Sequence, residues 1–175
     1  MSQTFYVDCE FDGHNGNLLS VAVVREDGYS LYLVVDTWAS DPWVQEHVLP
    51  IMQYHNADTY AVVQPNDVGT AIKTWLGAVR SFCVVADSPV DIGRFCAALS
   101  TGPDGNWCST DYETIKFEVR NVDCYPTVLQ GAVQHNAWWD AQALRVMFCD
   151  TTSSFYDGRA RRDNKSDCGD LEYEV

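Results

Sequence analysis

The sequence TFYVDCEF at residues 4–11 places two acids among residues that favour a β-strand. Alternate side chains of a strand point to the same face of its sheet, so Asp8 and Glu10 share a face. Two carboxylates there would repel each other and would be costly to bury, and a divalent cation between them would remove both costs. The alternative is that both acids lie in water at a frayed end of the strand.

Two further apolar runs follow this strand closely. Residues 18–25 and 29–36 are expected to be strands, and the Asp27-Gly28 pair between them is typical of a hairpin turn. Three consecutive strands with short connections predict an antiparallel meander at the start of a sheet.

Helical and strand patterns alternate in the rest of the chain. Asp41 and Pro42 are expected at the N-cap and first turn of a helix that ends at Pro50. The other expected elements are helices at 67–80, 91–99 and 137–149 and strands at 82–86 and 115–119, with a loop at 100–114. This alternation predicts one α/β domain over residues 1–151, with a mixed central β-sheet flanked by helices, and a polar C-terminal tail or arm at 152–175.

A second acidic motif, VVADSPVDIGRF at residues 84–95, runs from a buried strand through a turn into a helix. Asp91 is expected to open that helix, where an acid most often serves only as a cap. Asp87, four residues earlier, competes with Asp91 for a role in a site.

A third motif, HNAWWDAQAL at residues 135–144, puts His135 just before a helix and Asp140 inside it. Asp140 lies on the same side of that helix as Ala137 and Leu144, which is the apolar side. A buried acid needs a partner or a metal, and a histidine with a near-neutral pKa can take a proton from water. The motif therefore predicts an acid and a base that meet in one pocket.

The three motifs together supply four carboxylates and one imidazole, in the order Asp-x-Glu, Asp, His-x4-Asp. Two metal ions about 4 Å apart need about that many acidic ligands. The order resembles the DEDDh 3′–5′ exonuclease superfamily, which has an RNase H-like fold. The motifs that carry the resemblance are residues 8–10, 90–95 and 135–142. Residues 6–11, 18–24 and 43–50 also resemble the small mycobacterial-type 3′–5′ exoribonuclease family.

This resemblance implies an enzyme that hydrolyses phosphodiester bonds from the 3′ end of single-stranded RNA or short oligonucleotides and releases 5′-mononucleotides. It implies two Mg²⁺ or Mn²⁺ ions, with His135 as the general base. It also implies a possible homodimer. The implied metal ligands are Asp8, Glu10, Asp91 and Asp140.

Contacts to the terminal nucleotide are implied for Phe11 and Cys9. Phe11 follows the two acids and is expected to stack on the 3′ base, with core packing as the alternative. Cys9 stands where the family usually carries a threonine, and ADSP at residues 86–89 replaces the usual lead-in to the second motif. Both departures affect how the nucleotide is held, and neither removes a chemical residue.

The charge of the chain restricts how it can bind nucleic acid. It carries a net charge of −14 over 175 residues, and an acidic surface repels phosphate. Attraction would have to come from bound metal ions and from a few arginines, namely Arg94, Arg159, Arg161 and Arg162.

Two functions remain as alternatives to an exoribonuclease. One is a DNA-directed 3′–5′ exonuclease, and the other is a catalytically weak nucleotide-binding module.

The seven cysteines are widely spaced and include no Cys-x-x-Cys pair, so neither a zinc cluster nor a disulfide framework is expected. The sequence shows no signal-peptide pattern and no apolar run near the ~20 residues that a membrane span needs. We therefore expect a cytoplasmic protein with reduced thiols and no membrane partner.

The remaining histidines, His14, His47 and His55, are interpreted as structural. Of the adjacent pair Trp138 and Trp139, one side chain is expected to be buried and the other exposed.

Overall fold

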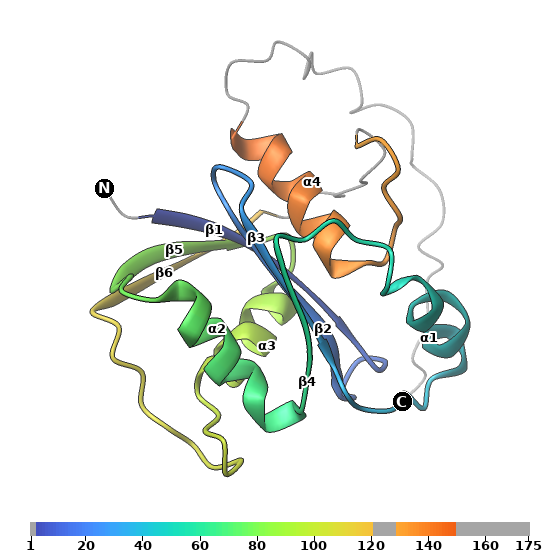
Figure 1. Ribbon diagram of the computed structural model, residues 1–175, viewed down its shortest axis with the longest axis horizontal. Helices are drawn as coiled ribbons and strands as arrows, with labels where there is room; N and C mark the ends of the chain where they lie inside the picture. Colours follow the sequence, from blue (N-terminus) through green and yellow to red (C-terminus); the bar gives the residue numbers. More distant parts are fainter. Residues whose placement is uncertain (1–2, 121–128, 150–175) are drawn as a thin grey trace, which may run out of the picture.

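A computed structural model describes residues 3–120 and 129–149 of the chain (Figure 1). Six strands form one mixed sheet: β1 (Gln3–Phe11), β2 (Leu18–Arg25), β3 (Ser30–Val35), β4 (Thr59–Val63), β5 (Ser81–Ala86) and β6 (Thr114–Val119). Their order across the sheet is β4-β3-β2-β1-β5-β6. The predicted antiparallel meander of β1, β2 and β3 is confirmed, whereas β4 pairs with β3, and β5 with β1 and β6, in parallel.

Helices cover both faces of this sheet, which confirms the predicted α/β class (Figure 1). They are α1 (Pro42–His47), α2 (Val68–Leu76), α3 (Pro89–Leu99) and α4 (Ala137–Cys149), with short 3₁₀ turns η1 (Leu49–Ile51) and η2 (Pro65–Asp67). The helices α2 and α3 pack on one face, and α4 lies across β1 and β2 on the other. The helix α1 sits beside the sheet, near the start of α4.

The alternation of β1 decides which face carries its acids. Phe5, Val7 and Cys9 enter the core beneath α2 and α3. Tyr6 enters the core beneath α4. Because side chains alternate along a strand, Asp8 and Glu10 lie on the Tyr6 side and face the helix that carries the third motif.

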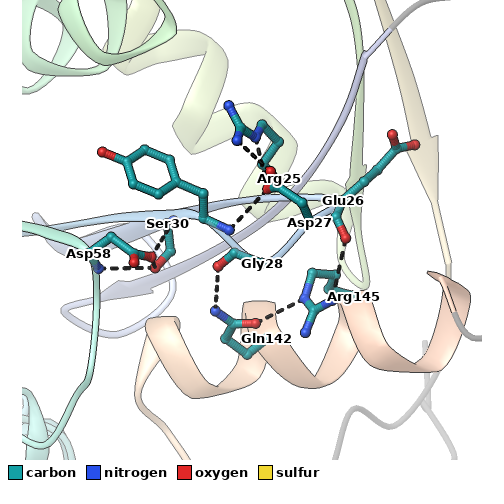
Figure 2. Close-up of polar contacts among 9 residues, drawn as sticks. Arg25, Glu26, Asp27, Gly28, Ser30, Asp58, Gln142 and Arg145 are labelled. Atoms are coloured by element: carbon teal, nitrogen blue, oxygen red, sulfur yellow. Dashed lines mark hydrogen bonds and ion pairs between the residues drawn. The ribbon is translucent and has the colours of Figure 1, made fainter.

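Polar contacts hold α4 against the turn between β2 and β3. Figure 2 shows Gln142 Nε2 donating to the carbonyl of Gly28 at 3.2 Å, in the turn between β2 and β3. The guanidinium of Arg145 donates to Gln142 Oε1 at 3.0 Å and to the carbonyl of Glu26 at 3.3 Å. On the same face, Ser30 donates to Asp58 from both its backbone N–H and its hydroxyl, each at 2.9 Å.

Both tryptophans of the third motif are buried, so the expectation that one would be exposed is wrong. Trp138 is 6% and Trp139 8% exposed. The indole N–H of Trp138 donates to Ser30 Oγ at 3.0 Å, and that of Trp139 to the carbonyl of Tyr54 at 2.7 Å. The segment after η1 covers the side of α4 that would otherwise face water, and burying each large side chain contributes about 1.5–3 kcal/mol.

Two other expectations differ from the structure. The edge strand β4 was not predicted, because its five residues, TYAVV, are too short a run to set a clear period. The helix α3 begins at Pro89 rather than at residue 91, since Ser88 is its N-cap and accepts the N–H of Val90 at 3.1 Å. Asp91 therefore does not cap the helix and its carboxylate is available for another role.

The described residues also bear on membrane spans, cysteines and the C-terminal tail. None of the described helices has the length and apolarity to cross a membrane. The described cysteine side chains, Cys9, Cys83, Cys96 and Cys108, are free thiols. The expected tail at 152–175, with its three arginines, lies outside the described residues.

Candidate active site

A cavity of about 420 Å³ opens where β1 and β5 end. These two strands are parallel, so their carboxyl ends meet at the same edge of the sheet. The residues that follow β5 and the last residues of β1 thereby reach one space, and the start of α4 closes it from the other side. Its lining includes all five residues that the sequence singled out for chemistry, namely Asp8, Glu10, Asp91, His135 and Asp140.

The carboxylates form two groups that share Asp8. One group is Asp8, Glu10 and Asp140, and the other is Asp8, Asp87 and Asp91. In each group, one oxygen from every residue lies within 4.8 Å of the others. Carboxylate oxygens are the ligands that Mg²⁺ and Mn²⁺ prefer. Each group could hold one divalent cation, and the two groups are neighbours because they share Asp8.

Burial and mutual repulsion raise the pKa of every predicted ligand. Burial raises the pKa of Asp8 well above its usual range, and Asp91, Asp140 and Glu10 raise it further. The pKa of Glu10 rises to about 8, first through burial and then through Asp140 and Asp91. A divalent cation bound near these carboxylates would offset both effects and lower their pKa.

The pKa values of the other two predicted ligands, Asp91 and Asp140, are raised by a smaller amount. Burial raises the pKa of Asp91 to about 7, assisted by the charge of Asp87 and a hydrogen bond with it. Burial also raises the pKa of Asp140 to about 7, against the effect of a hydrogen bond with the backbone of Asn136.

One atom of this cluster gives an independent sign that a cation fits. The Oδ1 atom of Asp140 is buried and has no hydrogen-bond partner among the described residues. A buried oxygen of this kind is costly to leave unpaired, and a bound cation would satisfy it. Both groups consist of Asp and Glu residues alone. Carboxylate oxygens suit Mg²⁺ or Mn²⁺ better than a softer metal.

Asn136 fixes the start of α4 and thereby the positions of His135 and Asp140 in the site. Its side chain is fully buried and accepts the N–H of Trp138 at 3.1 Å, as an N-cap residue does. Its amide donates to the carbonyl of Ile51 at 2.8 Å and to that of Tyr54 at 3.4 Å. The helix that carries Asp140 is thus tied to the η1 segment.

His135 lies in the loop just before this cap, on the cavity wall. Its φ of +61° is in the left-handed region, which costs a non-glycine residue about 1–2 kcal/mol. The ring packs edge-on against Trp43, with centroids 5.0 Å apart. Partial burial, and then repulsion from His47, lower its pKa, so the imidazole is neutral at pH 7.

Phe11 both lines the cavity and packs against the core, so its two interpretations are compatible. One face of its ring is covered by the guanidinium of Arg94, 4.9 Å from the ring centroid. The same guanidinium donates to the carbonyls of Gly16 at 2.8 Å and His14 at 3.3 Å. Arg94 therefore holds the loop after β1 through two of its five N–H donors.

The thiol of Cys9 points away from the acids of β1. Its side chain is 5% exposed and lies in the core beneath α2 and α3. The sulfur lies 3.9 Å from the carbonyl of Asp91, to which it donates a weak hydrogen bond. Cys9 thus joins β1 to α3, and it borders the cavity at its floor.

The structure adds residues that sequence reasoning left out or left undecided. Asp87 was an alternative to Asp91, yet both join Asp8 in one group. Trp43, 48% exposed at the start of α1, also lines the cavity. Asp12 accepts the N–H groups of Ser40 and Asp41, each at 2.8 Å, and so holds the segment that leads into α1. No sequence signal separates Asp12 from an ordinary loop acid.

Comparison with known proteins gives no family for this chain. No protein-family model matches it, and no curated protein sequence matches it significantly.

Proposed function

We propose that the protein is a divalent-cation-dependent 3′–5′ exonuclease that acts on single-stranded RNA or short oligoribonucleotides. The observation that carries this proposal is the pair of carboxylate groups sharing Asp8, with His135 on the wall of the same cavity. Two carboxylate groups that share one residue suit the pair of neighbouring cations that two-metal phosphodiester hydrolysis uses.

The sheet supports the proposal that the fold is RNase H-like. An antiparallel meander leads into two parallel strands on the far side of β1. The acids occupy the central strand β1, the segment after its parallel neighbour β5, and the helix α4 across the face. This is the order in which the sequence motifs resemble the exonuclease superfamily.

Each residue of the site has a distinct task in this proposal. Bound Mg²⁺ or Mn²⁺ would supply Lewis-acid stabilisation of charge on the scissile phosphate. The neutral His135 accepts the proton of the attacking water. Water oxygen bonds to phosphorus as the bond to the 3′ oxygen of the penultimate nucleotide breaks, so the released nucleotide keeps a 5′ phosphate.

The shape and charge of the site support action at a chain end. The cavity of about 420 Å³ is at the lower end of the ~300–1,000 Å³ typical of small-molecule sites, which suits one terminal nucleotide. Phe11 and Trp43 offer aromatic surface for its base. With a net charge of −14, the protein has to bind its substrate at a local site rather than along a basic surface.

End-labelled oligonucleotides test this proposal. We expect single-stranded RNA labelled at its 5′ end to shorten stepwise, and RNA labelled at its 3′ end to lose its label at once as a mononucleotide, only with Mg²⁺ or Mn²⁺. Matched single-stranded DNA should be degraded more slowly. Asp8→Ala should be inactive, and Asp111→Ala, at an exposed acid outside the cavity, should behave like the wild type. Shortening from the 5′ end, or undiminished activity in chelator, would contradict the proposal.

A further inference from the structure

Two hydroxyl groups are buried behind the acidic cavity. Ser20 and Tyr32 are both 0% exposed. Neither Ser20 Oγ nor Tyr32 Oη has a hydrogen-bond partner among the described residues. Leaving a buried hydroxyl unpaired destabilises a fold, so two of them on one face of a sheet need a physical reason.

The strand register brings these hydroxyls to Glu10. Ser20 on β2 lies directly opposite Glu10 on β1, and such pairs share a face with Cβ atoms about 4.5–5.5 Å apart. Tyr32 on β3 is opposite Ala22, and so lies diagonally next to Ser20 on that face. The three side chains therefore form a row across β1, β2 and β3, starting at the cavity and ending in the core.

The electrostatics of Tyr32 agree with this row. Burial raises the pKa of Tyr32 well above its usual value, the Ser20 hydroxyl lowers it, and the Glu10 carboxylate raises it further. The Tyr32 hydroxyl is thus close enough to feel both groups, although no hydrogen bond of ordinary geometry joins it to Ser20.

We propose that Tyr32 and Ser20 form a relay of hydrogen bonds that orients Glu10 for cation binding, an inference that rests on the proposed function. In the cation-loaded protein, Tyr32 would donate its proton to Ser20 Oγ, and Ser20 would donate its own proton to the ionised Glu10 carboxylate. A carboxylate that gives one oxygen to a cation needs a donor on the other, and such outer partners fix the orientation of metal ligands. Neither of the two described side chains borders the cavity, so both are positioning residues.

Calorimetric titration of the full chain with Mn²⁺ tests the relay without any substrate. Loss of an outer partner weakens metal binding about 10–100-fold, so Ser20→Ala should raise the Mn²⁺ dissociation constant about 10-fold, and Tyr32→Phe less. The double variant should bind no more weakly than Ser20→Ala, because Tyr32 acts only through Ser20. Tyr60→Phe is the matched control: its ring packs near Tyr32, but the residue is 46% exposed.

Melting of the metal-free variants separates positioning from packing. Removing an unpaired buried hydroxyl while keeping the ring should leave the melting temperature of Tyr32→Phe equal to that of the wild type or above it. Wild-type Mn²⁺ affinity in both Ser20→Ala and Tyr32→Phe would overturn the relay. If Ser20→Ala destabilises the fold, Tyr32→Phe alone decides between the two roles. A wild-type protein that binds no Mn²⁺ would instead overturn the proposed function itself.

Discussion

Asp8 belongs to both carboxylate groups, and burial, followed by repulsion from the neighbouring acids, raises its pKa. Its identity was predictable, because an acid two residues from another on an apolar strand has few structural roles. The part of Asp87 was not predictable: whether an acid in a turn reaches the cavity depends on where β5 ends relative to β1. Which carboxylates meet is thus set by strand register, which local sequence does not encode.

Replacing Asp8 should separate catalysis from folding. Asp8→Ala removes a buried charge that repels its neighbours, so the metal-free protein should melt at the wild-type temperature or above it. The rise in melting temperature on adding Mn²⁺ should be lost, since both cation groups lose their common ligand. Thermal unfolding with and without Mn²⁺ measures both effects, and a wild-type response to Mn²⁺ would exclude Asp8 as a ligand.

Asp91 should matter more than Asp87. Asp91 is only 4% exposed, whereas Asp87 is half-buried in the turn. A buried ligand has no water to replace the cation contact, so Asp91→Asn should abolish exonuclease activity, and Asp87→Asn should reduce it less. Rates of nucleotide release by the two variants compare them directly. The reverse order would show that Asp87 is the principal third ligand.

His135 should act in turnover and not in metal binding. General bases contribute about 10²–10⁴-fold to rate, so His135→Ala should lose roughly that factor while keeping the Mn²⁺-dependent rise in melting temperature. Because burial and His47 lower the pKa of His135, the imidazole stays neutral to below pH 6.5 and loses its function only in more acidic solution. Near wild-type rates for His135→Ala between pH 6 and 9 would leave it as a loop residue.

At the scale of elements, α4 and the meander were predictable and β4 was not. The bounds of α4 match residues 137–149, because an N-cap signal and a long apolar pattern coincide there. The helix α2 ends at Leu76, four residues before the expected end, since Gly77 takes a φ of +59°. The burial of the two tryptophans depends on distant segments, since Trp138 contacts Ser30 on β3 and Trp139 contacts Tyr54 after η1.

The N-cap of α4 should contribute more to stability than the N-cap of α1. Asn136→Ala should lower stability by about 1–2 kcal/mol for the lost cap, with a further loss because the carbonyl of Ile51 loses its partner. Asp41→Ala, which removes the N-cap of the shorter and more exposed α1, is the control and should cost less. Denaturant unfolding of both variants makes the comparison, and equal losses would mean that Asn136 serves only as a cap.

At the scale of the whole molecule, the clustered acids make stability depend on pH. Glu10, with a pKa of about 8, and Asp91 and Asp140, at about 7, all exceed the value of about 4 for unfolded carboxyls. A group with a raised pKa in the folded state stabilises the fold fully below the unfolded pKa and loses that contribution as pH rises through the folded pKa. The metal-free melting temperature should therefore fall between about pH 4 and pH 8. Mn²⁺ should reverse the trend, because cations bind the ionised acids. A flat profile without metal would contradict the clustering.

The product of hydrolysis in ¹⁸O-labelled water tests the central claim most directly. With Mn²⁺ and single-stranded RNA, mass spectrometry should find 5′-mononucleotides that carry one ¹⁸O in the phosphate, and the reaction should stop in excess chelator. Nucleoside 3′-phosphates, 2′,3′-cyclic phosphates, or the same products in chelator would contradict a cation-dependent attack of water on the terminal phosphodiester.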